Sequence, residues 1–186
     1  TNSGTVLVSG VTNLTASAGE ITLTTAGNDF TGVVNASGTN ITLVDTNTIT
    51  LGTVTASGTL SVTAGTNITQ SGTLLVSGAT NLTASAGEIT LTTAGNDFTG
   101  AVNASGTNIT LVDTNTITLG TVTASGTLSV TAGTNITQSG TLLVSGATNL
   151  TASAGEITLT TAGNDFTGAV NASGTNITLV DTNTIT

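Results

Sequence analysis

The chain has 186 residues and carries nine carboxylates but no Lys, Arg or His, so its formal net charge is −9. Binding to nucleic acid or to an anionic membrane surface is therefore disfavoured, because both need cationic patches. The absence of Cys excludes disulfides and thiolate metal sites, and no apolar run approaches the roughly 18 residues that a membrane span requires.

A 68-residue period organises the sequence. The string GEITLTTAGNDFTG begins at Gly19, Gly87 and Gly155. We interpret residues 1–186 as one continuous repeat region, with super-repeats at 19–86, 87–154 and 155–186 (partial) after a partial copy at 1–18. Because the chain opens in mid-repeat and shows no atypical capping segment, we expect it to be a fragment of something longer or a subunit that stacks end to end.

Each super-repeat divides into four lines that close on Gly. From residue 5 they read TVLVSGVTNLTASAG, EITLTTAGNDFTGVVNASG, TNITLVDTNTITLGTVTASG and TLSVTAGTNITQSG. Each opens with apolar residues at alternate positions, such as Ile41 and Leu43, which is typical of a half-buried strand. The closing Gly residues are expected to supply the backbone angles of tight corners.

A second segment in each line reads TNLT, NDFT, NTIT or TNIT and points one apolar residue inward. The residue before it is Asn, Asp or Thr, and Asn and Asp accept turn geometry by bonding to their own backbone. Stacked line above line, these residues are predicted to form a structural corner ladder: Asn13, Asp29, Thr48, Asn67, Asn81, Asp97, Thr116, Asn135, Asn149 and Asp165.

The predicted fold class is all-β, a parallel β-solenoid (β-helix) of about eleven coils of 14–20 residues, with four coils in each 68-residue super-repeat. A helix is excluded because no stretch sustains the three-and-four spacing of apolar residues. Disorder is a weaker alternative, since Gly, Ser and Thr are abundant but the aliphatic alternation is steady. Separate sandwich domains fit less well, because their repeat is usually nearer 100 residues.

The run AGNDFTGAVNASGTNITLVDTNTITLGTVTASGTLSVTAGTNITQSGTLLVSG resembles the repeats of filamentous-haemagglutinin-like giant exoproteins of Gram-negative bacteria. The resemblance covers essentially the whole chain. It implies a right-handed parallel β-helix, export across the outer membrane and a role as adhesin shaft or surface fibre. It supplies no functional residues to transfer.

Catalysis is not expected. Glu20, Asp29 and Asp45 fall on different segments, no His is present as a base, and the trio returns in every repeat. Corner and solvent-exposed positions are the default interpretation of these carboxylates. No cofactor or metal site is predicted, although weak surface binding of Ca²⁺ is an open alternative around AGNDFTG, where Asp comes only once in four lines.

Two further surface features have simple structural explanations. The Asn-x-Ser/Thr triplets at Asn13, Asn35, Asn40 and Asn67 follow from Asn at a corner and an outward Ser or Thr on the next strand, although glycosylation stays open. The outward strand positions are rich in Thr but irregular, which keeps ice binding as an alternative only.

The function expected from the sequence is a non-catalytic structural shaft of an extracellular, cell-surface bacterial fibre or adhesin. The expected partner is the protein itself, end to end or side to side in a fibre. The alternative is a surface-binding module that recognises glycan or ice through its Thr-rich faces.

Overall fold

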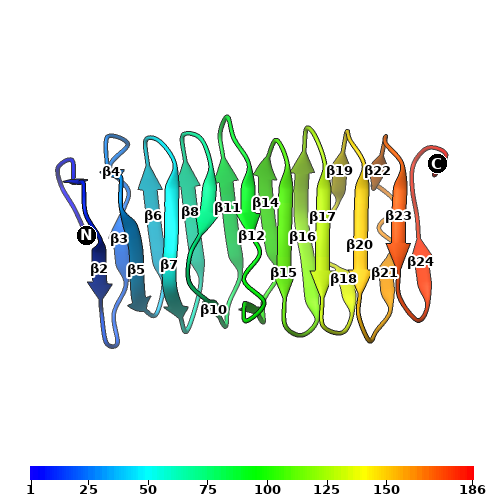
Figure 1. Cartoon of the computed structure of the whole chain (residues 1–186), viewed down its shortest axis with the longest axis horizontal. Helices are drawn as coiled ribbons and strands as arrows, with labels where there is room; N and C mark the ends of the chain where they lie inside the picture. The colour runs from blue at the N-terminus through cyan, green and yellow to red at the C-terminus, as the bar shows by residue number, and fades with distance from the viewer.

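The computed structural model describes residues 1–186 and consists of strands and turns, without a helix (Figure 1). The strands run across the long axis of the molecule, and the two termini lie at its opposite ends. Every strand pairs in parallel with strands one turn earlier or later, so the predicted all-β parallel solenoid is confirmed. No helix of the length and hydrophobicity needed for a membrane span is present.

Two eleven-stranded sheets form opposite sides of the rod. Sheet I comprises β2 (Thr12–Thr15), β5 (Val33–Gly38), β7 (Ile49–Ala56), β9 (Ile68–Gln70), β10 (Leu74–Val76), β12 (Ile89–Leu91), β13 (Asp97–Phe98), β15 (Ile109–Asp113), β17 (Leu128–Ala132), β20 (Thr148–Ala152) and β23 (Val170–Ser173). Sheet II comprises β3 (Ile21–Leu23), β6 (Ile41–Asp45), β8 (Leu60–Ala64), β11 (Thr80–Ala84), β14 (Val102–Gly106), β16 (Ile117–Ala124), β18 (Ile136–Gln138), β19 (Leu142–Val144), β21 (Ile157–Leu159), β22 (Asp165–Phe166) and β24 (Ile177–Leu179). A separate pair joins β1 (Leu7–Val8) to β4 (Asp29–Phe30).

The solenoid has about nine turns, not the eleven predicted. Both sheets have nine levels, because β9 with β10, β12 with β13, β18 with β19 and β21 with β22 share a level. At about 4.8 Å per level, the nine turns make a rod about 43 Å long.

A 68-residue repeat makes three and a half turns, which corrects the predicted four coils. In sheet II, Ile21 pairs with Ile41, Ile41 with Leu60, and Leu60 with Thr80, which completes three turns. Ile89 lies half a turn further on, in sheet I. The next equivalent residue, Ile157, is back in sheet II. Identical residues therefore alternate between opposite sides of the rod and return to the same side after two repeats.

The difference arises at a glycine that does not mark a corner. β9 and β10 flank Gly72 but pair with the two halves of the single strand β7. The sequence TQSGTLL thus continues along one side of the rod, where the line division predicted a new coil. A Ser-Gly dipeptide is equally compatible with a corner between two sides of the rod and with a short irregularity within one side.

The core is a column of small aliphatic side chains, as predicted, with one phenylalanine in each repeat. All 40 buried hydrophobic residues form a single cluster, which shows that the core is continuous along the rod. Alternation holds in β11 and β20, where every second residue is buried. Phe30, Phe98 and Phe166 are at most 1% exposed and are the largest side chains of the interior.

Many of the glycines act through close stacking, which corrects the predicted role in backbone angles. No glycine has a positive φ. A Cβ on Gly72 would lie 2.6 Å from the carbonyl carbon of Gly52, and one on Gly78 would lie 2.7 Å from that of Gly58, in the turn below. These positions need glycine because backbone lies directly against backbone.

Candidate functional site

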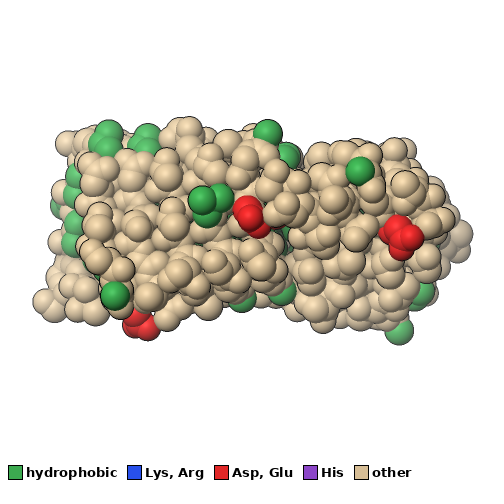
Figure 2. Space-filling model, turned by 90° about the horizontal axis from the view of Figure 1, so that it is seen from below, with side chains coloured by type: hydrophobic (Ala, Val, Ile, Leu, Met, Phe, Trp, Pro, Cys, Tyr) green, Lys and Arg blue, Asp and Glu red, His purple; other side chains and the backbone are tan.

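The surface of the rod consists mainly of uncharged polar groups. In the view of Figure 2, uncharged polar side chains and backbone cover most of the surface, with scattered hydrophobic side chains and a few isolated carboxylates, and the chain has no cationic side chain. The side chains that could act on a partner are therefore mainly Asn, Thr and Ser, with a few exposed carboxylates, ordered into columns by the parallel register.

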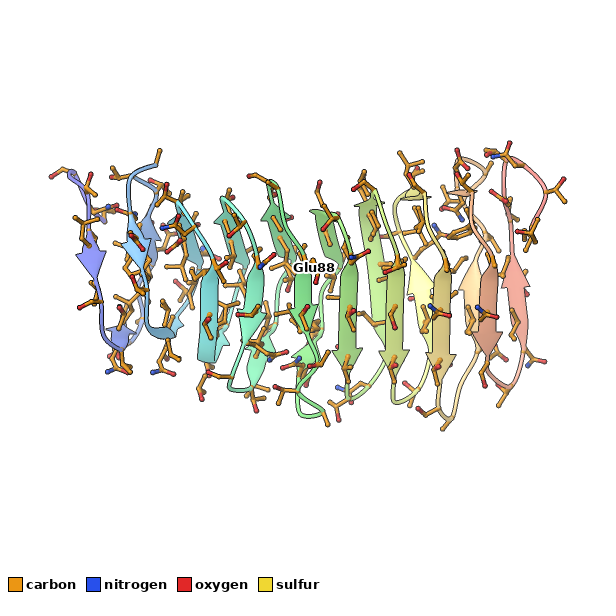
Figure 3. The ribbon with its side chains drawn as sticks, turned by 45° about the horizontal axis from the view of Figure 1, so that its top comes forward. Glu88 is labelled. Carbon is orange, nitrogen blue, oxygen red and sulfur yellow. The ribbon has the colours of Figure 1, made fainter.

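One column forms a polar ladder along an edge of the rod. It starts at Thr48, the residue before the buried Ile49. On the next levels, the backbone N–H of Glu88 donates to Asn67 Oδ1 (2.8 Å), and Asn108 Nδ2 donates to Glu88 Oε1 (2.8 Å). The ladder ends where the backbone N–H of Thr127 donates to Asn108 Oδ1 (2.9 Å). We call these five residues the edge ladder; Glu88 lies midway along the rod (Figure 3).

The ten residues of the predicted corner ladder do not form one column but occupy three kinds of position. Thr48 and Asn67 lie on consecutive turns of the edge ladder. Thr116 and Asn135 lie on consecutive turns of the equivalent column, half a turn away. The other six residues lie on the faces. Asn13, Asn81 and Asn149 pair with Asn35, Asn103 and Asn171, whereas Asp29, Asp97 and Asp165 pair with Leu7, Leu75 and Leu143.

The prediction missed Glu88, Asn108 and Thr127, which complete the edge ladder. A usable signal was present: each directly precedes the first buried aliphatic residue of its line, as Asn67 precedes Ile68. The predicted ladder contains only residues of the second segments, whereas the edge ladder also takes residues from the first segments of the lines.

A buried amide pair was also missed. Asn96 is completely buried, while the neighbouring Asp97, which the sequence favoured as the corner residue, is partly exposed. Asn96 Nδ2 donates to Gln70 Oε1 (2.9 Å), and Gln70 Nε2 donates to Asn96 Oδ1 (2.9 Å). Asn96 Oδ1 also accepts the backbone N–H of Leu74 (3.0 Å). Gln138 and Asn164 repeat the pair.

Two carboxylates are buried, contrary to the expected solvent or corner position. Asp45 and Asp113 are each 2% exposed. The Asp113 carboxylate accepts the backbone N–H groups of Phe98 (2.8 Å) and Asn115 (2.7 Å). Burial raises the pKa of Asp113 above its ordinary value of 3.8; the two hydrogen bonds lower it, and the charge of Asp97 raises it further. Both oxygens are thus used to bridge two turns of backbone.

The Thr residues form hydrogen-bonded columns instead of a regular double row. Thr50 and Thr69 hydroxyls lie 3.0 Å apart, and Thr48 and Thr66 hydroxyls lie 2.8 Å apart. No group of three or more metal-ligating side chains is present. Apart from its exposed carboxylates, the surface offers a set of ordered neutral donors and acceptors.

These features define a repeat protein of the β-solenoid class. A family model described as "Repeats of unknown function (DUF5649)" matches residues 1–37, 38–105 and 106–173, and the chain belongs to this family. The two complete matches each span 68 residues, the period found in the sequence. Comparison with curated proteins and with solved structures finds no match.

Proposed function

We propose that the chain is a non-catalytic shaft segment of an extracellular, cell-surface bacterial fibre or adhesin. The observation that carries this proposal is the half-integral repeat. Because each repeat ends half a turn out of phase, the rod presents the same surfaces on both sides, shifted along its axis. No one side of such a rod is distinct as a binding surface, which suits a spacer within a fibre better than a binding tip.

Two further observations support a mechanical role. The parallel ladder continues through every turn, so neighbouring turns are joined by backbone hydrogen bonds along the whole rod. The buried carboxylates also bond to backbone N–H groups instead of facing a cleft. Stability in such an array is approximately a sum over turns and their interfaces, which lets a shaft lengthen by adding repeats.

The resemblance to filamentous-haemagglutinin-like exoproteins supports the extracellular location. The net charge of −9 favours separation of neighbouring rods in solution. Association into a fibre would then proceed end to end, where strand edges pair.

Immunogold electron microscopy of cells that produce the protein tests the proposal. Antibodies raised against the purified 186-residue rod should label surface fibres at intervals along their length. Antibodies pre-absorbed with the rod provide the control. Label confined to the cell interior, or only to the tips of fibres, would contradict a shaft.

A further inference from the structure

A shallow groove recurs at the same place in every repeat. In sheet II it crosses β11, β14 and β16 and encloses about 330 Å³, lined at its surface by Asn81, Thr83, Asn103, Ser105, Thr121 and Thr123. The equivalent residues around Asn13 and Asn35 enclose about 350 Å³ in sheet I, and those around Asn149 and Asn171 about 200 Å³. The groove is thus a property of the repeat.

In sheet II the groove extends along the strands. A second hollow of about 340 Å³ shares Thr83, Ser105 and Thr123 with the first and continues to Ser85 and Ser125. From Asn81 to Ser85 the strand rises by about 13 Å. The resulting space is an elongated trough that crosses three turns.

Small interior residues lie beneath the trough. Ala84, Gly106 and Ala124 occupy equivalent positions on the three strands. These residues add little side-chain volume to the interior beneath this part of the trough.

The polar groups of the trough are held in place by hydrogen bonds, but not all of their donors have a protein partner. Asn103 Nδ2 donates to Asn81 Oδ1 (2.9 Å), and Asn103 Oδ1 accepts the backbone N–H of Thr121 (2.8 Å), so both amides are held in place. Asn81 is exposed, and its own Nδ2 donates to no protein group. The exposed hydroxyls of Thr83, Ser105 and Thr123 stand one above another on successive strands.

An exposed apolar side chain lies next to these polar groups. In the register, Thr123 is followed one turn later by Leu143, which is 43% exposed. In sheet I, Thr55 is followed in the same way by Leu75, also 43% exposed. An exposed Leu beside ordered hydroxyls and amides matches a ligand that has C–H faces and hydroxyl edges.

We propose that each trough binds a segment of a neutral glycan chain. No charged side chain lines it, and the chain carries −9 overall, so anionic polymers are disfavoured.

Successive troughs lie on opposite sides of the rod about 17 Å apart along the axis, and troughs on the same side recur at about 34 Å. Each contact is weak because the three phenylalanines are buried and no aromatic ring is available for stacking. Affinity comes from the two troughs of sheet I acting on one polymer, while the trough of sheet II lets one rod join a second glycan chain.

Affinity electrophoresis in gels containing dextran, a soluble β-glucan or mannan tests this proposal. Migration of the unaltered rod should be retarded by at least one of these polymers and not by anionic hyaluronan. The triple variant T15V/T83V/T151V removes one trough hydroxyl per repeat while keeping a β-branched side chain. Its affinity should fall by roughly fivefold or more.

The matched control is T42V/T110V/T178V, which removes three Thr hydroxyls outside the troughs and should bind as the unaltered rod does. Amide NMR of the unaltered protein gives a second readout that needs no variant: the side-chain signals of Asn81 and Asn103 should shift on titration with the retarding polymer in short-chain form. Absence of retardation by all three neutral polymers, retardation by hyaluronan instead, or equal loss in both variants would overturn the proposal. None of these outcomes bears on the shaft proposal, which rests on fibre labelling.

Discussion

Gln70 and Asn96 are 26 positions apart in the chain and are joined side chain to side chain by two hydrogen bonds of 2.9 Å. The Gln70 amide thereby covers the completely buried amide of Asn96, whose Oδ1 also accepts a hydrogen bond from the backbone N–H of Leu74. The first repeat has Asn2 in place of Gln70, one methylene shorter. There Asn2 Nδ2 donates to Asn28 Oδ1 (2.8 Å), but the buried Asn28 Nδ2 has no partner.

Asn2→Gln should therefore stabilise the rod. The longer side chain can complete the second hydrogen bond and satisfy Asn28 Nδ2, which is expected to raise the free energy of unfolding by about 1 kcal/mol. Urea unfolding followed by circular dichroism measures the change. The reverse variant, Gln70→Asn, provides the matched control and should destabilise the rod by a similar or larger amount; equal stability of all three proteins would contradict the assignment.

The burial of Asp113 predicts how stability depends on pH. Its folded-state pKa lies above the unfolded value, so the folded protein holds the proton more tightly. This contribution to stability is complete below the ordinary value of 3.8 and is lost as the pH rises through the raised folded-state pKa. Urea midpoints measured between about pH 3 and pH 7 should fall with rising pH.

Asp113→Asn tests whether this residue is responsible. The amide does not titrate, so the pH dependence should become flatter, while overall stability falls because the amide can accept only one of the two N–H groups through its oxygen. Glu88→Gln, which removes an exposed charge, is the control and should leave the Asp113 contribution in place. An unchanged slope in Asp113→Asn would count against the prediction.

The position of Gly120 has no room for a side chain. A Cβ at this position would collide with the side-chain oxygen of Asn103, which accepts the Thr121 N–H at a register shift between β14 and β16. Gly120→Ala should cost about 1–3 kcal/mol through loss of this hydrogen bond and local displacement. Thermal unfolding measures it, and Gly10→Ala, where an added Cβ meets nothing within 4 Å, should be close to neutral.

The number of turns per repeat predicts the diffraction of aligned rods. A reflection at about 4.8 Å should lie along the rod axis, with a repeat at about 17 Å and a full period of about 34 Å. Four turns per repeat would instead give about 19 Å. A strand reflection perpendicular to the axis would contradict the fold itself.

The sequence by itself determined the strands, the inward residues and the 68-residue period. Alternation such as that of Ile41 and Leu43 identifies the buried side of a strand because side chains point to opposite faces in turn. These features are local, so a single strand carries enough information to predict them.

Only the tertiary structure decided how many turns a repeat makes and which polar groups are buried. Gly72 lies within a side and not at a corner because β9 and β10 both pair with β7, and that pairing depends on a turn some 20 residues away. Asn96 is buried and Asp97 partly exposed because Gln70, on another turn, satisfies the Asn96 amide. Contacts between turns select among local alternatives of nearly equal energy, and the order of residues within one turn does not specify them.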